Sequence, residues 1–98
     1  MFELEWTTEA EAVFDRLKAN PSDKIRYNAV KKTLILLSEN PRHNSLQTRP
    51  FLSLAGPNRE KVFEAYAQQK TPAAYRVFWY YDNKKGTIVI LTITAHPK

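Results

Sequence analysis

The sequence predicts an α+β protein in which an N-terminal strand and a two-helix hairpin pack on one face of a mostly antiparallel sheet. Two apolar stripes at helical spacing lie close together within residues 8–40, and β-branched and aromatic residues dominate residues 75–95. Between these regions, residues 41–61 hold three of the six prolines, which is typical of an irregular connection. The expected order of elements is β-α-α-β-β-β, within one domain that spans residues 1–98.

Composition limits the class of protein. The 98 residues are 43% hydrophobic, which suits one compact core, and the absence of cysteine excludes disulfides and thiolate metal ligands. The acidic N-terminus does not fit a signal peptide, and no apolar run reaches the roughly 18 residues of a membrane span. We therefore expect a soluble cytoplasmic protein with no membrane partner and no cofactor.

Positive charge is concentrated in the second part of the chain. The net charge is +5, and residues 41–98 hold nine Lys and Arg against three Asp and Glu. This imbalance favours a nucleic acid or an acidic protein as the partner of that region. The alternative is that the charge only keeps a small domain soluble.

Alternation and a capping pattern predict the first two elements. Apolar residues alternate with glutamates over residues 2–6, which predicts a short, half-buried strand. Thr8 and Glu11 then fit a capping box at the start of a helix. The apolar stripe of this helix consists of Ala10, Val13, Phe14 and Leu17.

A second helix is expected to follow almost at once. Asn20 and Pro21 end the first helix, and either Ser22 or Asp23 can cap the next one. Pro41 ends the second helix, so the two helices should form an αα-hairpin. The apolar stripe of the second helix consists of Tyr27, Val30, Leu34 and Leu37.

Three strands are expected after the irregular connection. Residues 62–68 alternate again, and residues 75–95 predict a β-hairpin whose turn at residues 82–86 contains Gly86. Period-two alternation places Val77 and Trp79 on the face toward the helices and Arg76 on the exposed opposite face. Because a permanent charge among aromatic neighbours is unusual in such a strand, Arg76 is the first candidate for a functional residue.

The sequence excludes several kinds of catalytic site. It has no glycine-rich phosphate loop and no His/Cys cluster at metal-ligand spacing, and His43 and His96 are too far apart to be proposed as a ligand pair. Arg, Lys, His and Tyr on or beside a sheet remain. This set suits phosphodiesters, because Arg binds phosphate, His can transfer protons near neutral pH and aromatic rings can stack on bases.

Four features of the chain resemble the RelE/ParE superfamily of bacterial type II toxins. They are the element order, the Pro41-Arg42 end of the second helix, YRVFWYYD at residues 75–82 and TIVILTITAHP at residues 87–97. The resemblance covers nearly the whole chain and implies the RelE/ParE-like fold. It further implies a toxin that is a metal-independent, ribosome-dependent mRNA endoribonuclease. The implied partners are mRNA, the ribosome and an acidic cognate antitoxin, in a toxin-antitoxin hetero-oligomer.

The resemblance also implies the roles of individual residues. Arg76 matches an arginine that binds phosphate and stabilises the transition state, and His96 matches a histidine assigned to acid/base catalysis in the YoeB-like branch. The alternative for Arg76 is a structural arginine held by a carboxylate or by carbonyl groups at the sheet edge. The residues expected to contact RNA are Arg49, Arg59, Lys61, Tyr66 and Lys98.

The chain departs from the family at three places. Glu64 and Tyr66 stand approximately where RelE-like members have lysines, residues 43–54 contain no glutamate, and Pro97 follows His96 where several members use a tyrosine. Two other hypotheses therefore stay open. One is a protein of this fold without nuclease activity, which inhibits DNA gyrase or only binds an antitoxin, and the other is a basic α+β domain unrelated to toxins.

Overall fold

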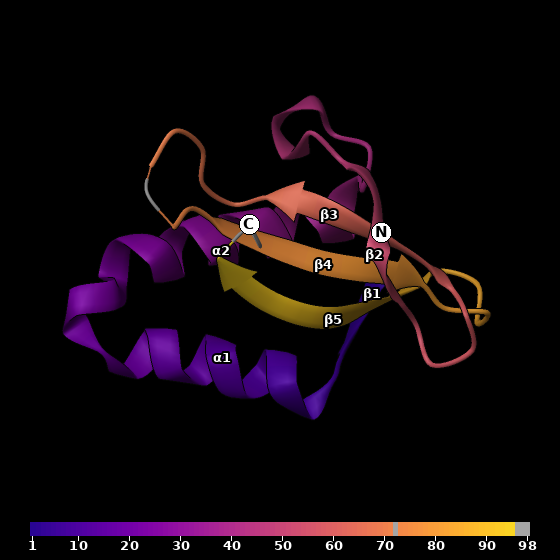
Figure 1. Ribbon diagram of the computed structural model, residues 1–98, viewed down its shortest axis with the longest axis horizontal. Helices are drawn as coiled ribbons and strands as arrows, with labels where there is room; N and C mark the ends of the chain where they lie inside the picture. The colour runs from indigo at the N-terminus through magenta and orange to yellow at the C-terminus, as the bar shows by residue number, and fades with distance from the viewer. Residues whose placement is uncertain (72, 96–98) are drawn as a thin grey trace.

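The computed structural model of the chain describes residues 1–71 and 73–95, in which two helices cover one face of a five-stranded sheet (Figure 1). The strands are β1 (Glu3–Trp6), β2 (Arg49–Ala55), β3 (Lys61–Tyr66), β4 (Tyr75–Tyr81) and β5 (Thr87–Ala95). The helices are α1 (Thr8–Ala19) and α2 (Lys24–Glu39), and the short 3₁₀ helices are η1 (Pro21–Asp23) and η2 (Asn44–Leu46). Within the described ranges, no helix is long and apolar enough to cross a membrane.

The sheet has the order β1-β5-β4-β3-β2. β1 pairs with β5 in parallel, with Leu4 opposite Ile88, and every other neighbouring pair is antiparallel. A bulge in the β4–β5 pair falls between Phe78 and Trp79. The predicted class, an α+β protein with two helices on one face of a mostly antiparallel sheet, is confirmed.

β2 is the element that the sequence did not predict. Residues 41–61 were expected to be irregular, yet residues 49–55 form the edge strand, and four strands follow the helices instead of three. β2 pairs with β3 only at Arg49, Pro50 and Ala55, with a register shift between the last two. An edge strand tolerates a proline and needs no buried face, so β2 has neither the alternation nor the composition of an interior strand.

The cap of α1 is Thr7, and not Thr8 as predicted. Thr7 has an extended backbone, and its hydroxyl oxygen accepts a hydrogen bond from the Ala10 amide at 3.1 Å. The same hydroxyl donates to the Leu91 carbonyl at 2.7 Å, and the Thr7 amide donates to the Ile90 carbonyl at 3.1 Å. These bonds to β5 fix where β1 ends, and the helix therefore begins directly after Thr7.

We expect Thr7→Ala to lower the free energy of unfolding by about 1–2 kcal/mol, because an N-cap hydroxyl and a bond to β5 are lost together. Urea denaturation followed by circular dichroism measures this. Thr8→Ala is the matched control, since Thr8 is exposed and changes at such positions cost within about 0.5 kcal/mol. A larger loss for Thr8→Ala than for Thr7→Ala would contradict this account of the helix start.

The connection between the helices is built differently from the predicted cap. The Asn20 side chain accepts from the Ser22 amide at 3.1 Å and so caps η1, whereas Asp23 stands at the N-cap of α2 without a side-chain capping bond. The Asp23 carboxylate instead pairs with Arg26 at 2.9 Å. Asp23 is thus at one of the two predicted positions, but its side chain acts through an ion pair.

Both faces of β4 are buried. On the helix side, Val77 and Trp79 belong to the main core, together with the buried residues of the two helices: Ala10, Leu17, Val30, Leu34 and Leu37. On the other side, Phe78 and Tyr80 form a second cluster with Val62 and Val89. Burial raises the pKa of the Tyr80 phenol, and the carboxylates of Glu60, Asp82 and Glu5 raise it further.

Candidate functional site

Arg76 lies on the sheet face that is turned away from the helices. It stands opposite Tyr66 of β3 and Thr94 of β5, two pairs along from Phe78 and Thr92. Since side chains on opposing residues share a face, β3, β4 and β5 bring these groups together on what we name the open face. The predicted face of Arg76 is therefore correct.

The predicted exposure of Arg76 is wrong, because the residue is only 8% exposed. Its Nη1 donates to the carbonyl oxygens of Gln68 at 2.8 Å, Tyr75 at 3.3 Å and Ala74 at 3.4 Å. The residues directly after β3 turn back toward the start of β4, with the Ala67 and Gln68 amides both donating to the Tyr75 carbonyl at 3.2 Å. The contacts match the alternative in which carbonyl groups hold the arginine.

The charge of Arg76 is nevertheless not neutralised by an acid. No carboxylate within residues 1–71 and 73–95 forms an ion pair with it, and its Nε is buried without a hydrogen-bond partner in that part of the chain. Carbonyl dipoles and the Tyr66 ring, whose centroid lies 3.8 Å from Cζ, surround the cation. A buried cation with an unused donor favours an anion at this place.

Tyr66 connects Arg76 to a second arginine. The Cζ of Arg49 lies 5.3 Å from the centroid of the same ring, and Arg49 Nη2 donates to the Tyr66 hydroxyl. Arg49 Nε also lies 3.6 Å from Oε1 of Glu64, a carboxylate that is nearly fully buried. We name Arg49, Glu64, Tyr66 and Arg76 the arginine–tyrosine cluster.

Glu64 is the member of this cluster that sequence reasoning missed as a site residue. It was noted only as a departure from the lysines of RelE-like proteins. The signal was present, because Glu64 alternates with Val62 and Tyr66 on one face of β3. A buried acid on the same face as two arginines lowers the positive potential that the arginines create there.

The remaining predicted RNA contacts do not join the cluster. Arg59 lies in the turn between β2 and β3 with a φ of 66°, and Lys61 begins β3 with its Nζ 5.7 Å from the centroid of the Phe63 ring. Tyr66 ends the same strand, so Lys61 is about 17 Å from it along β3. His96 and Lys98 lie outside the described residues.

The arrangement is suited to binding an anion through guanidinium groups and to stacking on the Tyr66 ring. In the part of the chain that the structure describes, no three His, Cys, Asp or Glu residues are grouped so that they could hold a metal ion. Proton transfer by His96 stays a prediction from the resemblance.

Comparison with known proteins gives a likeness in structure and none in sequence. No protein-family model matches the chain, and no curated protein matches it. Among solved structures, a YoeB/ParE toxin from Agrobacterium tumefaciens has a TM-score of 0.72 at 7% identity, covering 98% of this chain and 100% of that one. A YoeB dimer from Staphylococcus aureus has a TM-score of 0.66 at 12% identity, covering 98% of both chains.

A third solved structure extends the likeness to the RelE side. A chain of the intact RelBE toxin-antitoxin complex from E. coli has a TM-score of 0.64 at 12% identity, covering 100% of both chains. At these identities the likeness concerns the fold, and it extends over nearly the whole chain. The fold is the RelE/ParE-like toxin fold, which confirms what the resemblance implied.

Proposed function

We propose that this chain is the toxin component of a type II toxin-antitoxin system and that it acts as a ribosome-dependent mRNA endoribonuclease. The observation that carries the proposal is Arg76, a buried guanidinium without a carboxylate partner among the described residues, on the open face of a fold shared with YoeB and RelE toxins. The basic character of residues 41–98 supports an RNA partner.

The proposed reaction needs no metal. The ribose 2′-OH attacks the neighbouring phosphorus, the bond from phosphorus to the 5′ oxygen breaks, and a 2′,3′-cyclic phosphate and a 5′-hydroxyl result. Arg76 stabilises the negative charge that builds on the phosphate oxygens in the transition state. His96, or a group of the ribosome, moves the proton from the 2′-OH to the leaving 5′ oxygen.

A cognate antitoxin is part of this proposal. The E. coli RelE chain that resembles this one in fold was solved in a toxin-antitoxin complex. We expect an acidic antitoxin here, because it would meet a region with nine basic and three acidic residues.

The second candidate is a toxin of this fold that binds its target without cutting RNA, either by inhibiting DNA gyrase or by retaining only antitoxin binding. Two observations favour it. Three backbone carbonyls already occupy Nη1 of Arg76, and the buried carboxylate of Glu64 in the same cluster repels phosphate. The nuclease proposal therefore requires RNA phosphate to displace at least some of these carbonyl groups from Arg76.

Expression in growing bacteria separates the candidates. Endoribonuclease activity predicts growth arrest within minutes and new 5′-hydroxyl ends inside translated messages, which disappear when translation is blocked beforehand. Induction of the DNA damage response with filamentation, and intact messages, would support gyrase inhibition instead. Unchanged growth would support a binding-only protein and contradict both toxin activities.

A further inference from the structure

Two arginines contact Tyr66, and the proposed reaction gives the hydroxyl group of this residue no role. The Cζ atoms of Arg76 and Arg49 lie 3.8 Å and 5.3 Å from the centroid of the Tyr66 ring. Arg49 Nη2 also donates a hydrogen bond to the Tyr66 hydroxyl oxygen. The residue is half-buried, so a phenol with two cations beside it lies at the surface of the open face.

We propose that Tyr66 is the general acid of RNA cleavage and gives its hydroxyl proton to the leaving 5′ oxygen. This inference rests on the proposed function. The 2′ oxygen forms a bond to phosphorus, the bond from phosphorus to the 5′ oxygen breaks, and the Tyr66 proton passes to that oxygen as it leaves. His96 or a group of the ribosome then has only to take the proton of the 2′-OH.

The Tyr66 hydroxyl group is able to donate because its oxygen is used only as an acceptor. A tyrosine hydroxyl can accept one hydrogen bond and donate another at the same time. Arg49 supplies the bond that the oxygen accepts, and within residues 1–71 and 73–95 the hydroxyl donates to no other group. Its proton is therefore available to a ligand bound beside the ring.

The arginines are placed to stabilise the charge that develops when this proton leaves. Negative charge then builds on the Tyr66 oxygen, and preorganised cationic donors stabilise such charge. Arg49 Nη2 already donates to this oxygen, and the Arg76 guanidinium lies against the ring. Arg49 Nε lies 3.6 Å from Oε1 of Glu64, which helps to hold the Arg49 guanidinium in place. Arg49 is thus a positioning residue that acts through Tyr66.

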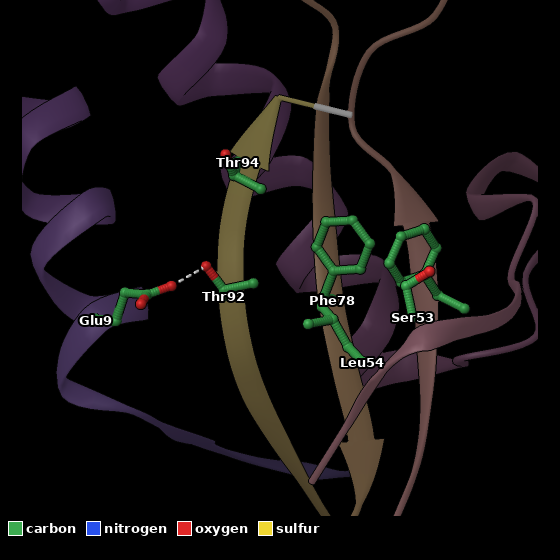
Figure 2. Close-up of a pocket in the computed structure, with 7 residues that line it drawn as sticks. Glu9, Ser53, Leu54, Phe78, Thr92 and Thr94 are labelled. Carbon is green, nitrogen blue, oxygen red and sulfur yellow. Dashed lines mark hydrogen bonds between the residues drawn. The ribbon is translucent and has the colours of Figure 1, made fainter. Parts of the chain in front are cut away.

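Two other acid–base groups of the open face are less well placed. Tyr80 follows Arg76 by four residues, about 13 Å along β4, and burial raises the pKa of its phenol. Figure 2 shows Glu9 on the α1 side of an open pocket of about 710 Å³, where its carboxylate accepts a hydrogen bond from the Thr92 hydroxyl. Tyr66, by contrast, stands directly opposite Arg76 and contacts its guanidinium.

A second open pocket, of about 380 Å³, lets solvent approach Tyr66 beside α2. Tyr66 forms part of its wall, together with Lys32 of α2, Ser45 of η2 and Gln69. Water that enters this pocket can return a proton to the Tyr66 oxygen after cleavage. The phenol can therefore act again in the next turnover.

Replacing the leaving oxygen by sulfur tests proton donation separately from any structural role of Tyr66. A thiolate leaves without being protonated, because thiols ionise far more readily than alcohols. The substrates are ribosome-bound messages that carry, at the position cut by the wild-type chain, either a normal phosphodiester or a 5′-bridging phosphorothiolate. We expect Tyr66→Phe to slow cleavage of the normal linkage by about a hundredfold and that of the phosphorothiolate by less than about threefold.

Two further variants complete the experiment. Tyr27→Phe is the matched control, because Tyr27 is also half-buried and its ring packs on Phe14 with centroids 5.0 Å apart, on the helix side of the sheet. It should leave both rates unchanged. Arg49→Ala should slow cleavage of the normal linkage by about tenfold in the wild-type chain but by less than about twofold in Tyr66→Phe, because Arg49 acts through the phenol.

The outcomes separate this inference from the proposed function. Equal slowing of both linkages by Tyr66→Phe, with folding verified by urea denaturation, would overturn the proton donor, because the hydroxyl would then serve only binding or structure. Undiminished cleavage of the normal linkage by Tyr66→Phe would also overturn it, while cleavage by the wild-type chain would still support the proposed function. A wild-type chain that cuts neither linkage would contradict both.

Discussion

Replacing Arg76 by alanine is expected to reduce mRNA cleavage in cells by at least about a hundredfold. Removing one preorganised donor that stabilises charge in a transition state typically costs about 10²–10³ in rate. Arg76 also lacks a carboxylate partner within the described ranges, so an RNA phosphate that displaces the carbonyl groups around it would meet an unneutralised charge. The measurement is mapping of new 5′ ends on messages after a short induction.

Folding has to be measured alongside cleavage. Alanine removes the guanidinium donor from the carbonyl groups of Gln68, Ala74 and Tyr75, which is expected to lower the free energy of unfolding by about 1–3 kcal/mol. Arg76→Lys keeps the charge but loses the planar fork, and it should retain more stability than alanine while still losing most of the cleavage. Arg16→Ala, at an exposed arginine on α1, is the matched control. Cleavage that persists undiminished in folded Arg76→Ala would remove Arg76 from the site.

Trp79→Ala is expected to cause the largest loss of stability, about 3–5 kcal/mol. Trp79 is fully buried in the main core, with its ring stacked on Phe63 at 5.0 Å and meeting Tyr81 edge-on at 4.9 Å. Domains of this size typically have only about 5–15 kcal/mol in total, so the variant should be near its folding threshold. Urea denaturation of the purified chain gives the value.

Two further variants define the cause of this loss. The indole Nε1 of Trp79 is buried without a hydrogen-bond partner in the described part of the chain, so Trp79→Phe keeps an aromatic ring and removes an unsatisfied donor. We expect Trp79→Phe to cost clearly less than Trp79→Ala. Ile25→Ala, at a residue that is 80% exposed, should change stability by less than about 0.5 kcal/mol. A loss at Ile25 equal to that at Trp79 would contradict the assignment of the core.

The sequence predicted those helices and strands whose buried face carries apolar residues at regular spacing. The stripes around Leu17 and Leu34 predicted α1 and α2, and the alternation after Tyr75 predicted the β4–β5 hairpin, because burial requires apolar residues at the period of the element. β2 escaped prediction because it lies at the edge of the sheet, with most of its side chains exposed and Leu52 89% exposed. An edge strand imposes no such periodicity.

The candidate site was predicted in part. Alternation placed Arg76 on the face opposite Val77 and Trp79, since period two fixes the faces within one strand. The pairing of Arg76 with Tyr66 depends on the register between β3 and β4, which alternation does not give. The burial of Arg76 depends on backbone carbonyls contributed by residues 68, 74 and 75, and every residue type has a carbonyl group. No side-chain pattern can reveal such contacts. Likewise, the meeting of Glu9 with Thr92 joins residues 83 positions apart, which a local pattern does not record.

The position of β5 in the sheet has a consequence for folding kinetics. β5 comes last of the five strands in the chain, yet it lies between β1 and β4, and β1 comes first. The sheet therefore cannot close during synthesis until β5 has been made, and its parallel pairing with β1 joins residues 84 positions apart, such as Glu3 and Thr87. Contacts of such long sequence separation form slowly because loop closure costs entropy before they contribute stability. The open face, which needs β3, β4 and β5 together, can accordingly be complete only after the last strand has been made.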